Sequence, residues 1–364
     1  MIKEGKFGPM EAICLMTIAI SGKVFFTSPA RVVSIVGTAG WMMSIISAST
    51  TILFFIFAYL LAKRFSDKDL VEIFEETLGK PLGFIFSISI CIATMYIASI
   101  RIREFSEVLK TYTLPKSPPS FIVGIFIIGI LVLSHLGLES IARLAKLLSY
   151  SLAMGLILVL ALSYKNYEVY RLFPILGYGV KPIVKNGILR SSAYFEIVFI
   201  LFFAKSLQGT KYIKKVGFTS LILSGIIITT CLLAFSLTFP YYTALEVTSP
   251  MYQLTTLIDY GRFLQRVDPV FLFIWTFSTF ISVALLFYVI LSIYCKVFRI
   301  PDMRPCLIPT GVILFTLCML PEDIATLFKM IQLQRNYSWL IFYAPILLTF
   351  FVALIRKKGA NNNA

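Results

Sequence analysis

Charged residues are scarce in this sequence of 364 residues. They make up 14% of the chain, and hydrophobic residues make up 58%, whereas a soluble globular chain has about 25% charged and about 45–50% apolar residues. The mean hydropathy is +0.88. A chain of this length cannot bury so much apolar surface inside itself, so much of it must face lipid. This composition argues against a disulfide-stapled secreted module and against an ordinary cytosolic enzyme.

Residues that carry metal or nucleophile chemistry are also few. The chain has one histidine, His135, and six cysteines without paired metal-ligand spacing. It has no P-loop and no nucleophile elbow. We therefore expect no metal site, no other cofactor and no enzymatic activity. The cysteines are interpreted as small buried apolar residues.

Positive charge is in excess, because 33 Lys and Arg oppose 18 Asp and Glu to give a net charge of +15. The basic residues are spread through loops and do not gather on one amphipathic face. This distribution argues against a nucleic-acid partner and is typical of a membrane protein that fixes its orientation. With a cytoplasmic N-terminus, 18 of these residues lie in inner loops or near the inner ends of the apolar stretches and 12 lie in outer loops or near the outer ends, with Lys23, Arg101 and Arg103 left out as lying within stretches. We therefore predict that both termini are cytoplasmic.

Ten apolar stretches are separated by polar breaks, and a bilayer-spanning helix needs about 20 such residues. They are residues 9–36, 39–62, 82–102, 121–135, 141–163, 192–203, 216–240, 270–297, 306–320 and 338–355. The sixth stretch is short and reaches full length only with residues 187–190, which indicates an irregular start. The first stretch is too long for a cleavable signal peptide. We predict an all-α integral membrane protein with ten transmembrane helices in a single domain, residues 1–364.

Two loops carry additional patterns. Residues 67–79 (DKDLVEIFEETLG) place apolar side chains at helical spacing between acids, which predicts an amphipathic helix on the inner surface. It could be a docking helix or a solvated connection. Residues 164–185 contain two prolines and two glycines, so we predict a structured, non-helical outer loop that covers a vestibule.

The first stretch contains a helix-breaking pattern near its middle. Gly22 permits unwinding, and Pro29 removes a backbone donor. Lys23 lies at a depth where insertion costs about 2.5–3.5 kcal/mol, so it is expected to face a cavity or a partner. The alternatives are close helix packing at Gly22 and snorkelling of Lys23 to the interface. We predict that the helix breaks at residues 21–24.

The sixth stretch begins with a second polar group, at residues 191–196. Glu196 precedes an apolar run, so its carboxylate is expected to be protonated, paired or hydrated inside the membrane, and Lys23 is a possible partner. In a five-plus-five arrangement, the first and sixth stretches occupy corresponding positions in the two halves of the chain. Interrupted helices at such positions indicate a binding site near the midplane of the bilayer. The candidate ligand-binding residues are Ser21, Gly22, Lys23, Ser191, Ser192, Tyr194 and Glu196.

Four charged residues lie at the end of the third stretch. Helical spacing places Arg103 on one face with Glu107, and it also pairs Arg101 with Glu104. We interpret them as a salt-bridge network near the outer surface. If the helix continues to Tyr112, they could instead line a polar path into the vestibule.

The order and spacing of several segments resemble the permease-like B subunits of bacterial spore germinant receptors, a family within the amino acid-polyamine-organocation superfamily. The segments are GKVFFTSP at 22–29, PILG at 174–177 with Gly179 and Pro182, Glu196, FLQR at 263–266 with FLFIW at 271–275, and LPED at 320–323. Together they extend over nearly the whole chain.

This resemblance implies a LeuT-like five-plus-five inverted repeat, with repeats at about 8–163 and 187–356 and interrupted helices 1 and 6. It also implies a small germinant, often an amino acid, that is sensed in the spore inner membrane together with A and C subunits. By position, Gly22 corresponds to the unwound glycine of the first helix and Glu196 to the acid of the sixth. Lys23, Val24 and Phe195 stand where relatives tend to have smaller residues, and they would shrink or recharge the pocket.

Three functions stay open at this point. The leading interpretation is a ligand-sensing receptor subunit. The second is a proton-coupled amino acid transporter. The buried Lys23 ammonium could take the part that a coupling sodium ion or proton plays in a transporter, or it could bind a ligand carboxylate. The third is a structural subunit whose pocket has decayed, with specificity held by its partners.

Overall fold

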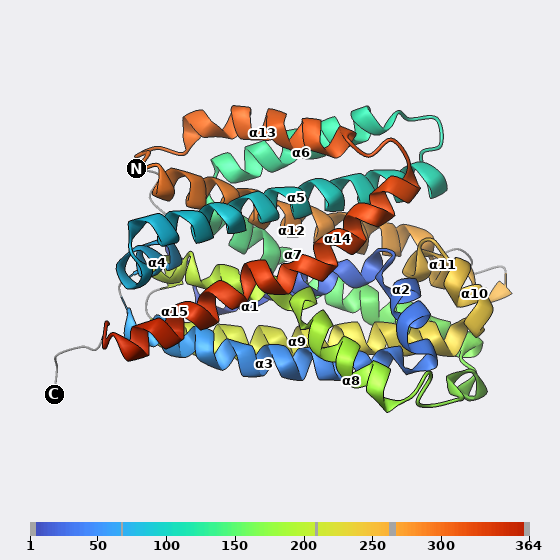
Figure 1. Cartoon of the computed structure of the whole chain (residues 1–364). Coiled ribbons are helices and arrows are strands. Elements are labelled where there is room, and N and C mark those ends of the chain that lie inside the picture. The colour runs from blue at the N-terminus through green and yellow to red at the C-terminus, as the bar shows by residue number, and fades with distance from the viewer. Residues whose placement is uncertain (1–4, 67, 208–209, 262–266, 360–364) are drawn as a thin grey trace.

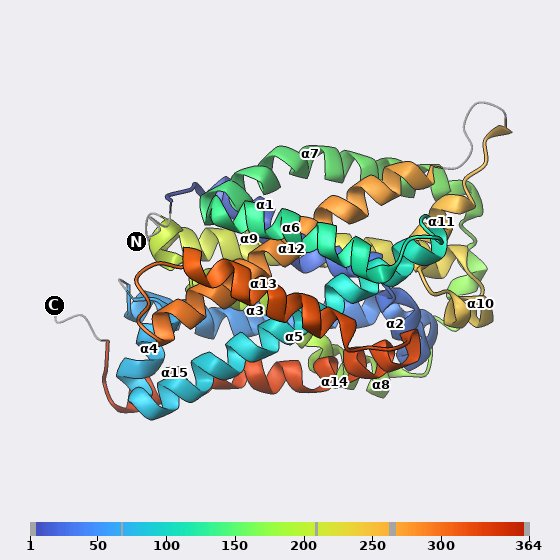
Figure 2. The same cartoon turned by 90° about the horizontal axis from the view of Figure 1, so that it is seen from above.

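The computed structural model describes residues 5–66, 68–207, 210–261 and 267–359, and most of them lie in helices. Figures 1 and 2 show a bundle whose long helices run roughly along one axis. In both views α4 lies near the end of the bundle where α15 finishes, and α10 and α11 lie at the opposite end. We call these the α4 end and the α10 end.

The first half of the chain alternates long helices with short 3₁₀ segments, labelled η. In order they are α1 (Pro9–Ser21), η1 (Gly22–Phe25), α2 (Ser28–Val36), η2 (Gly37–Ala39), α3 (Gly40–Arg64), α4 (Leu70–Leu78), α5 (Lys80–Tyr112), α6 (Pro119–His135) and α7 (Leu138–Leu162).

The second half begins with irregular structure and continues with long helices. Its elements are η3 (Ser163–Asn166), η4 (Val169–Leu172), α8 (Val180–Leu189), η5 (Arg190–Leu201), η6 (Ala204–Leu207), α9 (Thr210–Thr238), α10 (Tyr241–Glu246), α11 (Pro250–Thr256), α12 (Asp268–Val297), α13 (Arg304–Met319), α14 (Ile324–Phe342) and α15 (Ala344–Ile355).

Six helical segments of the described residues are long and apolar enough to cross a membrane. They are Ser28–Arg64, Lys80–Tyr112, Leu138–Asn166, Tyr212–Thr238, Asp268–Val297 and Ile324–Ile355. Pro119–His135 and Arg304–Met319 are shorter apolar helices. The chain is therefore a helical membrane protein, and the count of ten spans stays a prediction.

The core is centred on α12, where every residue from Ile281 to Ile293 is buried. A helix that is apolar all round has no face for water, so it packs at the centre. α12 contacts α5, α7 and α1.

The interpretation of the cysteines as small buried apolar residues holds for four of the six. Cys91, Cys231, Cys295 and Cys318 are buried, whereas Cys14 and Cys306 are half-buried.

The amphipathic helix predicted for residues 67–79 is observed as α4, and Asp67 lies outside the described residues. Its start is fixed by a capping box. The Asp69 carboxylate accepts from the backbone N–H of Glu72 at 3.1 Å, and the Glu72 carboxylate accepts from the Asp69 N–H at 2.9 Å. Leu70, Val71 and Phe74 are buried, so α4 docks on the bundle and is not a solvated connection.

The segment 164–185 is only partly the loop that the sequence predicts. Residues from Val180 onward form α8, because a proline in the first helical turn, here Pro182, loses no hydrogen bond that the helix would have made. The loop part is attached to the end of α2. Tyr178 N–H donates to the Val36 carbonyl at 3.4 Å, and Thr38 donates to the Pro174 carbonyl.

Replacing Gly177 by alanine is expected to destabilise this attachment more than replacing Gly179. Both glycines have positive φ, +50° and +107°, so either substitution carries backbone strain of about 1–3 kcal/mol. A Cβ at Gly177 would also collide with the Val36 carbonyl oxygen, whereas one at Gly179 meets nothing within 4 Å. Thermal unfolding of the two variants measures the difference. Equal loss of stability would contradict the close contact with α2.

Candidate functional site

The first apolar stretch changes conformation at Gly22. The α-helix ends at Ser21, the next four residues form η1, and Phe26 is extended (φ −92°, ψ −157°) before α2 begins at Ser28. Pro29 lies in the first turn of α2, where its missing N–H is tolerated. Gly22 packs against α12, since an added Cβ would lie 3.7 Å from the Ser278 side chain.

The sixth stretch is 3₁₀-helical over Arg190–Leu201, and Tyr194 has non-helical torsions (φ −104°, ψ 19°). Side chains from other elements meet its backbone. The Ser191 carbonyl accepts from Thr51 of α3 at 3.1 Å and from the Tyr343 hydroxyl at 2.9 Å. Irregular backbone at membrane depth requires partners of this kind, so the segment is held by its surroundings.

Glu196 joins the two irregular segments. Its side chain is 0% exposed, and its Oε2 lies 2.7 Å from Lys23 Nζ while its Oε1 lies 2.8 Å from Arg101 Nη2. Lys23 Nζ also donates to the Ala193 carbonyl. One carboxylate thus pairs with two cations from η1 and α5. The pairing of Lys23 with Glu196, which depends on helix rotation, is observed.

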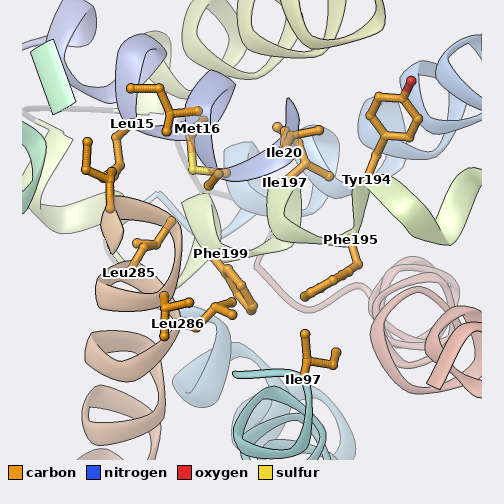
Figure 3. Close-up of a cluster of buried hydrophobic side chains, with 14 of the residues drawn as sticks. Leu15, Met16, Ile20, Ile97, Tyr194, Phe195, Ile197, Phe199, Leu285 and Leu286 are labelled. Atoms are coloured by element: carbon orange, nitrogen blue, oxygen red, sulfur yellow. The ribbon is translucent and has the colours of Figure 1, made fainter. Parts of the chain in front are cut away.

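Apolar side chains enclose this ionic group. Figure 3 shows Ile197 of η5 next to Ile20 of α1, and Phe195 between η5 and Ile97 of α5. Phe195 also lies under the Lys23 ammonium, 5.3 Å from Nζ to the ring centroid. The low-polarity surroundings strengthen each ion pair and raise the cost of leaving any of these charges unpaired.

The charged end of the third stretch is arranged differently from the surface network that the sequence predicts. Arg103 pairs with Glu107 at 2.8 Å, as expected. The predicted pair of Arg101 with Glu104 is wrong, because Arg101 contacts Glu196 and donates to Ser282 of α12. Arg101 therefore pairs with a buried carboxylate from a distant part of the sequence and not with the neighbouring carboxylate at helical spacing. The helix continues to Tyr112. This was the condition under which the sequence allowed these charged residues to line a polar path into the vestibule instead.

Glu104 has a separate partner at the start of α2. Its Oε1 accepts from the Thr27 N–H at 3.1 Å and from the Thr27 hydroxyl at 2.6 Å. A carboxylate at a helix N-terminus satisfies a free backbone donor and is favoured by the helix dipole. Glu104 therefore fixes the position at which α2 starts after the irregular segment.

A cavity of about 90 Å³ lies beside the Glu196 group, between η1, α2, α5, η5 and α14. Its charged and amide side chains are Lys23, Arg101, Glu104, Arg190, Gln334 and Arg335. We call it the cationic cavity, because four of these side chains are cationic and one is anionic. Within the described part of the chain, the guanidinium groups of Arg190 and Arg335 have neither a hydrogen bond nor an ion pair.

The structure brings together some of the predicted binding residues and separates others. Lys23 and Ser192 line the cationic cavity, and Glu196 lies behind it. Ser21 lines a different, apolar cavity, and Tyr194 lines a small one toward α3 and α9.

Sequence reasoning missed Arg190, Gln334 and Arg335 as cavity residues. Gln334 and Arg335 belong to α14, which begins at Ile324. The sequence placed them in a loop, because the predicted tenth span begins only at residue 338. The signal that could have found them is the pair of polar residues 334–335 between apolar residues at helical spacing.

A second group of ion pairs ties α4 to the bundle. Asp69, whose side chain is 3% exposed, lies 3.1 Å from Lys296 of α12, and Glu72 lies 2.7 Å from Lys205. Partial burial alone would raise the pKa of Glu72, but hydrogen bonds from Lys205 and from the Asp69 N–H outweigh it and lower that pKa below 4.5. These contacts attach α4 to η6 and to α12 at the α4 end of the bundle.

The chain has detectable relatives among known proteins. A family model described as "Spore germination protein" matches residues 6–327. Spore germination protein A2 of Bacillus subtilis is 25% identical over 97% of both chains. Spore germination protein B2 of the same organism is 22% identical over 98% of this chain and 97% of the relative, and protein KB is 22% identical over 70% and 69%.

Solved structures share the fold at low sequence identity. A Na⁺-coupled sialic acid symporter in a substrate-bound outward-open state has a TM-score of 0.68 and 10% identity, over 97% of this chain and 91% of the symporter. MhsT in complex with L-phenylalanine has a TM-score of 0.64 and 16% identity, over 96% and 89%. The architecture is therefore that of these transporters, and the chain belongs to the spore germination protein family.

Proposed function

We propose that the chain is the ligand-sensing, permease-like subunit of a spore germinant receptor and that it binds a small germinant at the cationic cavity. The observation that carries the proposal is the pairing of Glu196 with Lys23 between two segments that are not α-helical, directly beside that cavity. A ligand that contacts both segments stabilises one of their arrangements. It shifts the equilibrium only if its affinity differs between the two conformational states.

The wider setting of the proposal follows from the family. We place the chain in the spore inner membrane with both termini cytoplasmic, together with receptor A and C subunits that read its conformation. Its ten spans form a five-plus-five inverted repeat, residues 8–163 and 187–356, with the first and sixth interrupted. Ser21, Gly22, Ser191 and Tyr194 then act by shaping the interrupted segments, and Lys23 and Ser192 act at the ligand.

A proton-coupled amino acid transporter is the second candidate, and the fold shared with a Na⁺-coupled sialic acid symporter favours it. Uptake of a labelled amino acid into liposomes that contain this chain alone would distinguish the two. A structural subunit with a decayed pocket is disfavoured by the cavity itself, which a decayed site would have filled.

Gly22→Leu is expected to abolish the germination response, whereas Gly22→Ala is expected to preserve it. A methyl group at Gly22 makes ordinary contact with Ser278, but a leucine side chain forces η1 away from α12. The measurement is the germinant dose response of spores carrying each variant, with the membrane level of the subunit checked by immunoblot. For the leucine variant we expect no response at the germinant concentration that saturates the unaltered protein, which corresponds to at least a tenfold rise in the required concentration, or about 1.4 kcal/mol. An unaltered dose response at normal protein level would contradict the proposal.

A further inference from the structure

The cationic cavity has an excess of positive charge that the described residues do not neutralise. Lys23, Arg101, Arg190 and Arg335 are opposed by two carboxylates, Glu104 on the lining and Glu196 behind it, which leaves an excess of two. Both carboxylates are already hydrogen-bonded, and among the described residues neither forms a hydrogen bond or ion pair with Arg190 or Arg335. Glu104 is close enough to Arg335 for a weaker electrostatic interaction. An uncompensated charge inside a membrane protein costs several kcal/mol, so this arrangement favours an anion.

Most of the oxygen atoms that could receive an ammonium group already accept hydrogen bonds. The Glu196 oxygens accept from Lys23 and Arg101, and the Ala193 carbonyl accepts from Lys23 as well. Glu104 Oε1 accepts twice from Thr27, and Glu104 Oε2 has no hydrogen bond to the described residues. The α-ammonium of a zwitterionic amino acid would therefore lie among four cationic side chains, with Glu104 Oε2 as its one unengaged carboxylate oxygen.

The donors that would receive a carboxylate are available. The guanidinium groups of Arg190 and Arg335 line the cavity from opposite elements, η5 and α14, and no hydrogen bond or ion pair engages them within the described ranges. A guanidinium matches a carboxylate with two parallel N–H···O bonds. The Gln334 amide, on the same cavity wall, adds a polar group that suits a hydroxyl or keto oxygen.

The volume limits the size of the ligand. A cavity of about 150 Å³ holds one benzene molecule in another protein. At about 90 Å³ the cationic cavity is smaller, so it admits a ligand of at most about six heavy atoms. A short-chain carboxylate fits this limit, and a large or aromatic amino acid does not.

We infer that the cationic cavity binds a small carboxylate that carries no ammonium group, held between Arg190 and Arg335. The inference rests on the proposed sensing function and names the ligand class of that site. In this arrangement the Lys23 ammonium occupies the position that the α-ammonium of an amino acid ligand would otherwise take, beside Glu196 and the Ala193 carbonyl.

Binding of L-lactate and L-alanine to the full chain in nanodiscs tests the inference. The two probes have the same carbon skeleton and size, but a hydroxyl replaces the ammonium, so they differ in net charge. We expect L-lactate to bind at least about tenfold more tightly than L-alanine. We expect Arg190→Gln and Arg335→Gln each to weaken L-lactate binding by about tenfold or more, and Arg335→Lys to weaken it less.

Two controls complete the test. Arg143→Gln removes a surface arginine that pairs with Glu139, and its side chain is 71% exposed, so L-lactate binding should not change. Sodium nitrate should compete with L-lactate much more weakly than acetate does. Equal competition by nitrate would overturn the assignment of a carboxylate.

The remaining outcomes separate this inference from the proposed function. L-Alanine binding as tight as that of L-lactate, and lost in Gly22→Leu, would overturn the anion inference and leave the sensing function intact. L-Lactate binding that survives both glutamine substitutions would overturn the location. If neither probe binds, the inference fails, and the spore dose response of Gly22→Leu decides the function independently.

Discussion

Replacing Glu196 by alanine is expected to lower the free energy of unfolding by about 3–5 kcal/mol, because it leaves two buried cations without a partner. The carboxylate is 0% exposed and pairs with both Lys23 and Arg101. The measurement is the apparent unfolding midpoint in detergent or nanodiscs. The matched control is Glu72→Ala. It loses an ion pair with Lys205 that is about half exposed, worth about 0–1 kcal/mol, and one hydrogen bond of the α4 capping box, worth about 1 kcal/mol.

The double variant Glu196→Ala/Lys23→Ala is expected to be more stable than the sum of its single effects predicts. Removing Lys23 takes away one of the stranded charges, so the coupling should be about 0.5–3 kcal/mol. Loss of stability in Glu196→Ala no larger than in Glu72→Ala would show that Glu196 does not hold the two irregular segments together.

Lys23→Ala is expected to reverse the ligand preference of the cationic cavity. The substitution frees Glu196 Oε2 and the Ala193 carbonyl, while Arg101 stays on Oε1. An α-ammonium then finds the two acceptors that Lys23 had occupied. We expect L-alanine binding to strengthen and L-lactate binding to weaken by about tenfold each, so that the ratio of the two affinities changes about 100-fold, or about 2.7 kcal/mol.

The same binding assay measures this reversal, and Lys205→Ala serves as the control because it removes a surface lysine of the α4 end. Lys23→Ala should still fold, since Glu196 and Arg101 remain as a one-to-one pair. An unchanged ratio of affinities in a folded Lys23→Ala variant would mean that Lys23 does not determine the charge of the ligand.

The sequence predicts the membrane class and the place of the site because both depend on local signals. Apolar length marks the spans, and the glycine and proline around Lys23 mark the point where α1 gives way to η1. Glu196 was located by its position before an apolar run. Lys23 is a possible partner of Glu196 from the sequence, but whether the two side chains meet depends on helix rotation, which periodicity alone does not fix.

Long-range contacts account for most of what the sequence did not predict. Arg101 has a local partner at helical spacing, but the fold brings Glu196 closer. The polar side chains of α14 look like a surface loop until the cavity that they line is known. The FLQR segment, residues 263–266, lies outside the described residues.

The attachment of Gly177 and its neighbours to α2 gives that helix a mechanical role. α2 starts next to Glu104 and carries the Pro174–Tyr178 turn at its other end. Its nine residues form a rigid arm of about 13 Å, so a pivot of about 10° at the cavity would displace the turn by about 2 Å. The turn and the start of α2 beside the cavity would then move together, so a shift of α2 at the ligand would reach the Pro174–Tyr178 turn without any loop refolding.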